Sequence, residues 1–204
     1  MDWEEIINIG VGVLVPVIIA IGLPFALRKR KKQGPTKVDG FYEQLRENGV
    51  NCSSLEEGAK STKIGTSKWS GAKTLKSFDV VDKQYKWINL TAISSQYGTN
   101  YYIEFLVKSP NLCIINPKKA HLKRTKRRNQ SEEIVYKGDK SFTINLELDY
   151  QLETLLNRSE FVGAIEIIPE PKHGYTRIRT PFVELTPEFL DAINILARHI
   201  KSQF

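Results

Sequence analysis

The feature that most constrains this chain is an uncharged run of 22 residues, 6–27, fourteen of which are Ile, Val, Leu or Phe. At about 1.5 Å per residue, a helix of this length reaches about 33 Å, and the hydrocarbon core of a bilayer is about 30 Å thick. The run therefore predicts a transmembrane helix, which leaves the remainder of the chain to form a separate domain.

A cleaved signal peptide is the main alternative for this run. Such a peptide has a basic start, a shorter apolar stretch and a cleavage site of small residues. This chain begins with the acidic stretch "MDWEE", and no A-x-A-like site precedes Arg28. We therefore expect an uncleaved membrane anchor.

Five basic residues follow the run directly: Arg28, Lys29, Arg30, Lys31 and Lys32. Lys and Arg beside a membrane span are retained on the cytoplasmic side. The expected protein is a single-pass protein of the cell membrane, with residues 1–5 outside and the carboxyl-terminal domain in the cytoplasm. Each cation near an anionic leaflet contributes about 1 kcal/mol of binding, so these residues are also predicted to bind lipid headgroups.

Two other features bear on which side of the membrane the domain occupies. Four asparagines match the glycosylation pattern, which would matter only if the domain faced outward: Asn51, Asn89, Asn129 and Asn157. We give the basic residues more weight than these sites. Cys52 and Cys113 fit reduced thiols inside a cell, and whether they form a disulfide stays open.

A second basic cluster lies about ninety residues after the first. Lys and Arg number 30 against 23 Asp and Glu, and twelve of the 30 belong to the two clusters, so the remaining surface is mildly acidic. No acidic residue interrupts the sequence between Glu104 and Glu132. The second cluster consists of Lys118, Lys119, Lys123, Arg124, Lys126, Arg127 and Arg128.

Three interpretations of this second cluster are open. The plainest is a solvated loop between two strands. The second is contact with anionic phospholipids or with an acidic protein, because the anchor already holds the domain near the bilayer. The third, nucleic-acid binding, is less favoured because the cluster contains no aromatic residue for stacking on bases.

Residues 74–204 show the patterns of a folded domain. Residues 85–94 and 100–108 are rich in aromatic and β-branched residues, and "SQYGTN" between them predicts a hairpin turn. "FTINLEL" alternates apolar and polar residues and predicts a strand with Phe142, Ile144, Leu146 and Leu148 facing inward.

The last third of the chain mixes helical and strand patterns. We expect a helix over 150–157, a helix running into a strand over 160–168, and strands over 175–179 and 182–185. Thr186 and Pro187 are typical of the start of a helix, and the apolar residues that follow make it amphipathic. The predicted fold class is α+β, an antiparallel sheet with packed helices that include this carboxyl-terminal one.

The expected organisation has four parts. Residues 1–5 form an external tail and 6–27 the transmembrane helix, and 28–73 form a basic juxtamembrane segment with a short helix over 38–48 and a linker. Residues 74–204 form the α+β domain. The oligomeric state does not follow from these patterns.

Motifs that carry chemistry are not evident in this sequence. It contains no glycine-rich phosphate loop and no G-x-S-x-G elbow. His121, His173 and His199 lie in a basic stretch, a turn and a helix end, so none is placed like a metal ligand or a buried base. We therefore predict no catalytic residue, no metal and no cofactor, and an enzyme with an unrecognised site stays open as an alternative.

The carboxyl-terminal half carries a loose resemblance. The stretches "FTINLELDYQLETLLNRSEFVGAIEIIPE" and "RIRTPFVELTPEFLDAINILARHI", placed behind an amino-terminal span, resemble small single-pass membrane proteins of prokaryotes whose function is unknown. The resemblance implies the architecture and carries no site residues. The expected function is thus a membrane-anchored binding or scaffolding protein, with a membrane-tethered nucleic-acid-binding protein and an enzyme as alternatives.

Overall fold

The computed structural model describes residues 40–56, 58–64, 71–115, 117–126, 132–159 and 161–204. The chain divides into two compact units, Met1–Tyr42 and Glu43–Phe204, and the architecture below is that of the second unit. The predicted membrane span and the basic residues 28–32 lie outside the described residues. In the part of the chain that is described, no helix combines the length and the apolar character that crossing a membrane requires.

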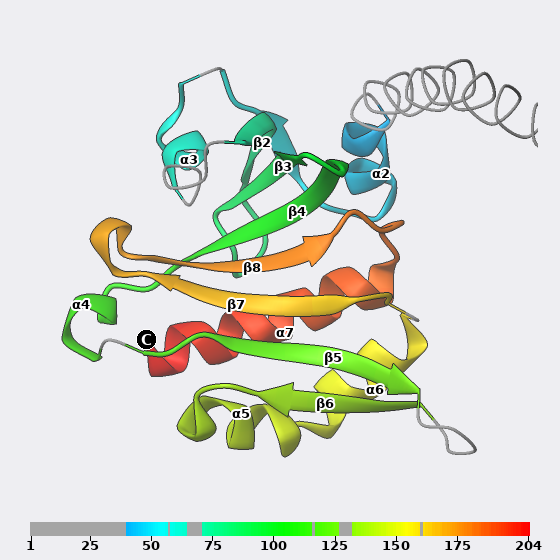
Figure 1. The fold of residues 1–204 in the computed structure, drawn as a ribbon, viewed down its shortest axis with the longest axis vertical. Helices are drawn as coiled ribbons and strands as arrows, with labels where there is room; N and C mark the ends of the chain where they lie inside the picture. Colours follow the sequence, from blue (N-terminus) through cyan, green and yellow to red (C-terminus); the bar gives the residue numbers. More distant parts are fainter. Residues whose placement is uncertain (1–39, 57, 65–70, 116, 127–131, 160) are drawn as a thin grey trace, which may run out of the picture. The chain divides into compact units, whose positions relative to one another are not determined.

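The frame of the second unit is an eight-stranded sheet in which every neighbouring pair of strands is antiparallel (Figure 1). The spatial order is β1-β2-β3-β4-β8-β7-β5-β6. The strands are β1 Cys52–Ser54, β2 Ala72–Val80, β3 Trp87–Ser95, β4 Gly98–Lys108, β5 Ala120–Lys126, β6 Glu132–Lys137, β7 Ala164–Glu170 and β8 Tyr175–Pro181.

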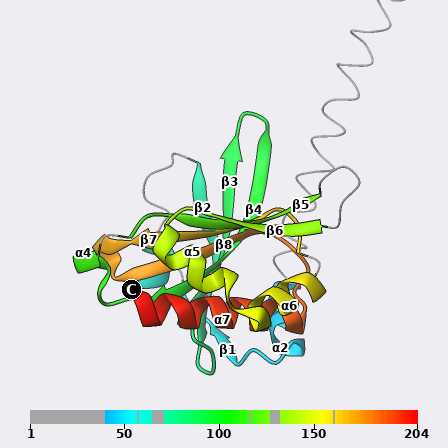
Figure 2. The ribbon, with the colours of Figure 1, turned by 90° about the horizontal axis from the view of Figure 1, so that it is seen from below.

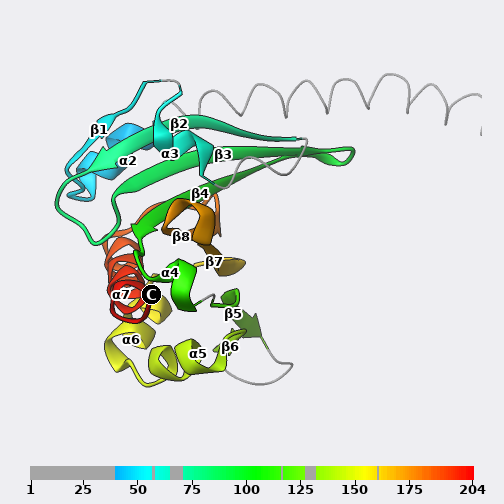
Figure 3. The same ribbon diagram turned by 90° about the vertical axis from the view of Figure 1, so that its left-hand side faces the viewer.

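Three of the helices, α5, α6 and α7, lie on one face of this sheet (Figure 2). Viewed from the side, α6 and α7 lie together beside β4, β8 and β7 (Figure 3). The predicted α+β class, an antiparallel sheet with packed helices, is thereby confirmed. The helices are α2 Phe41–Glu47, α3 Lys60–Lys63, α4 Leu112–Ile115, α5 Lys140–Glu147, α6 Tyr150–Arg158, the short 3-10 helix η1 Pro171–His173 and α7 Pro187–Gln203.

The carboxyl-terminal helix α7 begins where the sequence predicts. The side chain of Thr186 accepts a hydrogen bond from the backbone N–H of Phe189 at 3.2 Å, which satisfies a donor that the first turn would otherwise leave open. Phe189, Ile193, Leu196 and Ile200, spaced three or four residues apart, are buried against the sheet, as an amphipathic helix requires.

The hairpin β3–β4 is also as predicted. Ser95 pairs with Gly98, so Gln96 and Tyr97 form a two-residue turn. In β4, Ile103, Phe105 and Val107 alternate toward the helices and are fully buried. The base of this hairpin thus contributes to the core, while its tip, residues 94–100, is exposed.

The prediction for "FTINLEL" was wrong, because the segment forms helix α5 and not a strand. Asp139 caps the helix by accepting hydrogen bonds from the N–H and the hydroxyl of Ser141, at 3.1 and 2.7 Å. Phe142 and Leu146 are buried, whereas Ile144 is 53 % exposed. Phe142 and Leu146 are four residues apart. Side chains at this spacing share one face of a helix, and they also share one face of a strand, so the pattern alone did not distinguish the two structures.

Three further segments differ from expectation. The helix expected over 160–168 does not form, and strand β7 begins at Ala164. The stretch 182–185 lies beyond the end of β8 and is not a strand. The expected linker contains β1, which pairs with β2, and α3, which lies against β2 and β3. β1 and α3 are only three and four residues long, so the alternation or periodicity of their apolar residues could not identify them.

The face of the sheet that points away from α7 is partly polar. On β2 and β3, Ser77 donates its hydroxyl to the side chain of Asn89 at 2.6 Å, and Asn89 donates to the backbone oxygen of Ser61 in α3 at 2.8 Å. All three residues are buried. Buried polar groups in the interior are stable when they are paired in this way.

Candidate functional site

The predicted basic residues of the second cluster do not form one loop. Residues 120–126 are strand β5, which pairs with β6 on one side and β7 on the other. The apolar residues Ala120 and Leu122 point toward the helices and are buried. Their alternation is the signal that could have identified the strand, but it is diluted by the surrounding charges.

Because β5 is an extended strand, the basic residues of the second cluster lie on different faces and at different ends of it. Lys118 and Lys119 are exposed just before the strand, and Lys123 is exposed on the face opposite the helices. Lys126 ends the strand about 23 Å from Lys119, at about 3.3 Å per residue. Arg127 and Arg128 lie outside the described residues.

Arg124 points to the helix side and is used within the fold. It donates from Nη2 to the backbone oxygen of Leu156 at 2.6 Å, and more weakly to that of Asn157 at 3.4 Å. Its guanidinium also lies 5.1 Å from the centre of the Phe161 ring. Arg124 thus satisfies carbonyl groups at the carboxyl end of α6, which favours a structural role over contact with an external anion.

Pairing of the strands gathers other lysines at one end of the sheet. Lys108 at the end of β4 pairs with Tyr175 at the start of β8, and His121 at the start of β5 pairs with Lys137 at the end of β6. The turn between β2 and β3, η1 and the carboxyl end of α7 lie at this same end. We call it the lysine-rich end, made of Lys83, Lys86, Lys108, Lys118, Lys119, Lys137, Lys140, Lys172 and Lys201.

The acidic side chains nearby are already engaged. Asp79 forms an ion pair with Lys86 at 2.9 Å, and Glu170 accepts from Arg177. Asp139 caps α5, and Asp82 accepts from the backbone N–H of Asn51 at 3.3 Å. Sequence reasoning found only Lys118 and Lys119 of this group, because the other lysines are scattered singly along the chain.

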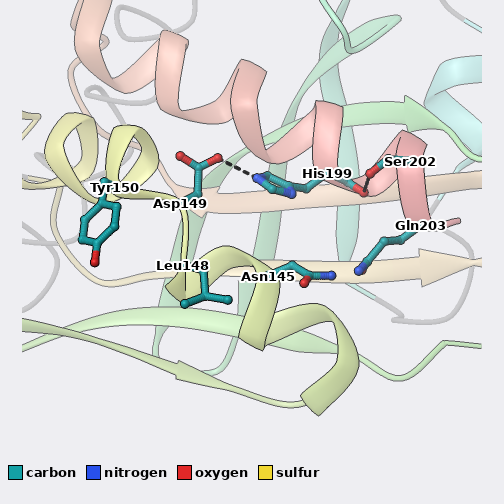
Figure 4. A pocket seen from close by; sticks show the side chains of 7 residues that line it. All are labelled: Asn145, Leu148, Asp149, Tyr150, His199, Ser202 and Gln203. Carbon is teal, nitrogen blue, oxygen red and sulfur yellow. Dashed lines mark hydrogen bonds and ion pairs between the residues drawn. The ribbon is translucent and has the colours of Figure 1, made fainter.

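A separate cavity of about 440 Å³ lies between α5, α6 and α7 (Figure 4). In it, Oδ2 of Asp149 lies 2.7 Å from Nε2 of His199, and Oδ1 of Asp149 accepts from the backbone N–H of Leu152 at 2.9 Å. Ser202 donates its hydroxyl to the backbone oxygen of its own helix at His199, and not to the imidazole ring. This arrangement ties α6 to α7 and lacks the nucleophile-to-base contact of a hydrolase triad.

Asp149 also gives this contact a dependence on pH. Burial raises the pKa of Asp149, but hydrogen bonds from His199 and Leu152 lower it, and the balance lies below the usual value. A carboxyl group with a lowered pKa stabilises the fold above its ordinary pKa of about 3.9, and this contribution is lost as the pH falls through the folded-state value.

We expect Asp149→Asn to lower the free energy of unfolding by about 1 kcal/mol at pH 7, because asparagine can still cap α6 but carries no charge to face His199. The wild type begins to lose this advantage as the pH falls below about 4 towards the folded-state pKa, so the difference between the two proteins should be smaller at pH 3.5 than at pH 7. Urea unfolding of the full chain at pH 7 and pH 3.5 measures this. Asp191→Asn, an exposed carboxylate on α7, serves as control, and equal losses for Asp149→Asn at both pH values would contradict the assignment.

A buried network of charges crosses β4, β8 and β7 on the face opposite the helices. Glu104 is 1 % exposed and Arg177 6 % exposed. Arg177 pairs with Glu104 through Nη1 and with Glu170 through Nη2, the latter at 2.7 Å, and Thr91 donates to Glu104 at 3.1 Å. Since these side chains offset one another's charges and hydrogen-bonding groups, we interpret the network as part of the structure of the sheet.

Cys52 is free and buried, and burial, with a smaller contribution from Asp82, raises the pKa of its thiol, which disfavours reactivity. The glycosylation pattern at Asn89 falls on a fully buried side chain, while Asn51 and Asn157 are exposed and Asn129 lies outside the described residues. Among the described residues, no group of three His, Cys, Asp or Glu side chains is arranged to hold a metal ion.

Comparison with models of protein families, with curated proteins and with solved structures finds no match for this chain.

Proposed function

We propose that this chain is a membrane-anchored binding protein whose α+β domain contacts anionic lipid headgroups through its lysine-rich end. Residues 6–27 serve as the anchor, the basic residues 28–32 keep the domain on the cytoplasmic side, and no catalytic activity is involved. The observation that supports this most is the exposure of Lys118 and Lys119. Among the described residues their ammonium groups form no ion pair with a carboxylate, although the backbone N–H of Lys118 donates to Asp139 at 3.3 Å.

The magnitude of the interaction follows from charge and distance. Each cation held at an anionic surface contributes about 1 kcal/mol, within a Debye length of about 8 Å at physiological salt. Of the second basic cluster, the proposal concerns Lys118 and Lys119. It does not include Arg124, because the guanidinium of Arg124 is hydrogen-bonded to the backbone of α6. Lys123 is exposed on the face of β5 opposite the helices, so it adds charge to a different part of the surface.

Tethering of nucleic acid is the alternative with fewer features in its favour. Aromatic side chains that stack on bases would be expected beside the cations. At the lysine-rich end, Trp87 and Tyr175 stack on each other with ring centroids 4.9 Å apart, and Tyr175 is only 8 % exposed. These rings are not available to bases in this arrangement.

Lysine footprinting of the full chain tests the proposal. We reconstitute it in vesicles of phosphatidylcholine alone, or with about one third phosphatidylglycerol, and measure acylation of each lysine by mass spectrometry. With two cations near the surface, about 2 kcal/mol predicts that Lys118 and Lys119 react at least several-fold more slowly in the anionic vesicles. Lys60 and Lys63 of α3, both exposed, should be unchanged.

Controls separate the parts of this proposal. In 1 M salt the Debye length falls to about 3 Å, so the protection should disappear. Equal reactivity of Lys118 and Lys119 in the two kinds of vesicle would exclude headgroup contact at this end. Protease protection of tagged termini in intact and opened cells tests the orientation independently, and an accessible carboxyl terminus in intact cells would contradict it.

A further inference from the structure

Four lysines from three separate parts of the chain surround one cavity of about 380 Å³ at the lysine-rich end. Lys83 and Lys86 come from the turn between β2 and β3, Lys108 from the end of β4, and Lys201 from the last turn of α7. Tyr175 and the backbone turn complete its walls. We call this cavity the lysine basin.

The walls of the lysine basin are held in place by hydrogen bonds. The backbone N–H of Gln84 donates to the side chain of Asn194 in α7 at 2.7 Å, and the N–H of Lys86 donates to the backbone oxygen of Leu106 at 2.8 Å. Lys201 donates to the side chain of Gln84 at 3.1 Å. The turn is thus fixed to both β4 and α7, so its lysines need little ordering before a ligand binds.

Positive charge in the lysine basin exceeds the negative charge beside it. Asp79 pairs with Lys86, and Asp82 in the same turn faces β1 through its bond to Asn51. The ammonium groups of Lys83 and Lys108 form no ion pair or hydrogen bond with another described residue. Asp79 offsets the charge of Lys86 only, so the ammonium groups of Lys83, Lys108 and Lys201 still repel one another, and a bound anion would offset that repulsion.

The chemistry of the lining indicates which anion. No arginine, whose planar fork binds carboxylate or phosphate in a bidentate manner, lines the lysine basin, whereas the lysines act as separate point charges. A phosphate group carries up to two negative charges and three terminal oxygens, which accept hydrogen bonds from several directions at once. Lysines that approach from a turn, a strand end and a helix end suit such a tetrahedral group better than a planar one.

We propose that the lysine basin is a binding site for a phosphate monoester or a short polyphosphate, with Lys83 and Lys108 as its principal ligands and Lys86 and Lys201 beside them. This inference goes beyond the proposed function, because a bound phosphate group requires neither a membrane anchor nor contact of Lys118 and Lys119 with lipid. The phosphate belongs either to a soluble molecule or to the headgroup of a lipid.

Calorimetric titration of the full chain with inorganic pyrophosphate, in neutral maltoside micelles at low salt, tests this site. The variant Lys83→Gln/Lys108→Gln should bind pyrophosphate at least about tenfold more weakly than the wild type. Lys60→Gln/Lys63→Gln removes the same charge from exposed positions on α3, and it should stay within about twofold of the wild type. Urea midpoints of both variants verify that the fold is kept.

Two results would overturn the proposal: absence of pyrophosphate binding by the wild type, or equal weakening in both variants, which would show an unspecific effect of net charge. Nanodiscs identify the source of the phosphate. If phosphatidic acid, a monoester, competes with pyrophosphate more strongly than phosphatidylglycerol, a diester, the lysine basin takes a lipid headgroup; if neither competes, it takes a soluble phosphate. Pyrophosphate binding without lipid protection of Lys118 and Lys119 would support this site and reject the proposed headgroup contact.

Discussion

Replacing Arg177 by methionine is expected to lower the free energy of unfolding by about 3–5 kcal/mol. The substitution removes the cation that faces Glu104, which is 1 % exposed and would keep only Thr91 as a partner. A buried carboxylate without a counter-charge is strongly unfavourable, while methionine retains most of the length and volume of the arginine. The urea midpoint of the full chain in neutral micelles, read by tryptophan fluorescence, gives the loss.

A second arginine on β8, which pairs with a residue of β7, provides a matched control. Arg179 pairs with Glu166, whose side chain is 41 % exposed, so water can replace the arginine. Arg179→Met should therefore lower the free energy of unfolding by about 1 kcal/mol or less. Adding Glu104→Met to Arg177→Met should recover part of the loss, because the stranded charge is then removed as well. Equal losses for Arg177→Met and Arg179→Met would show that Glu104 is not buried as described.

The second large effect is expected at Phe142 in α5. Phe142 is fully buried and its ring lies 5.0 Å from that of Phe204, so Phe142→Ala should lower the free energy of unfolding by about 3–5 kcal/mol through the cavity it leaves. Ile144, two residues away, is 53 % exposed, and Ile144→Ala should change the free energy by about 0.5 kcal/mol or less.

This pair of variants distinguishes a helix from a strand directly. In a strand with the face that the sequence predicts, both side chains would point into the core, and both alanine variants would be strongly destabilised. In helix α5 the two positions lie about 200° apart around the axis, at about 100° per residue, so only one is buried. A large loss at Ile144 would therefore reject α5.

The elements that were predicted correctly carry local signals that agree with one another. For α7, the cap at Thr186, the proline that follows it and the apolar spacing all indicate the same start and the same buried face. For "FTINLEL", the cap at Asp139 indicates a helix and the alternation indicates a strand, and tertiary packing decided between them. Strand β5 was missed for a similar reason, because its charges concealed the alternation of two buried residues.

The candidate sites were less accessible to sequence reasoning than the fold. Lys118 and Lys119 were identified because they are adjacent in the sequence, whereas Lys108 and Lys201, which line one cavity, lie 93 positions apart. The same holds for Arg177 and Glu104, which are separated by 73 positions. Only the register of β4 against β8 brings such residues together, and register across a long connection cannot be derived from local pattern.

The strand order also has a consequence for how the protein is made. β8 lies between β4 and β7, so it joins two half-sheets, β1-β2-β3-β4 and β7-β5-β6, although it is synthesised after all of them. Until β8 leaves the ribosome, each half keeps an open hydrogen-bonding edge that neighbouring nascent chains can pair with. The interval between the synthesis of β4 and that of β8 is therefore the period in which this protein is most exposed to misassembly.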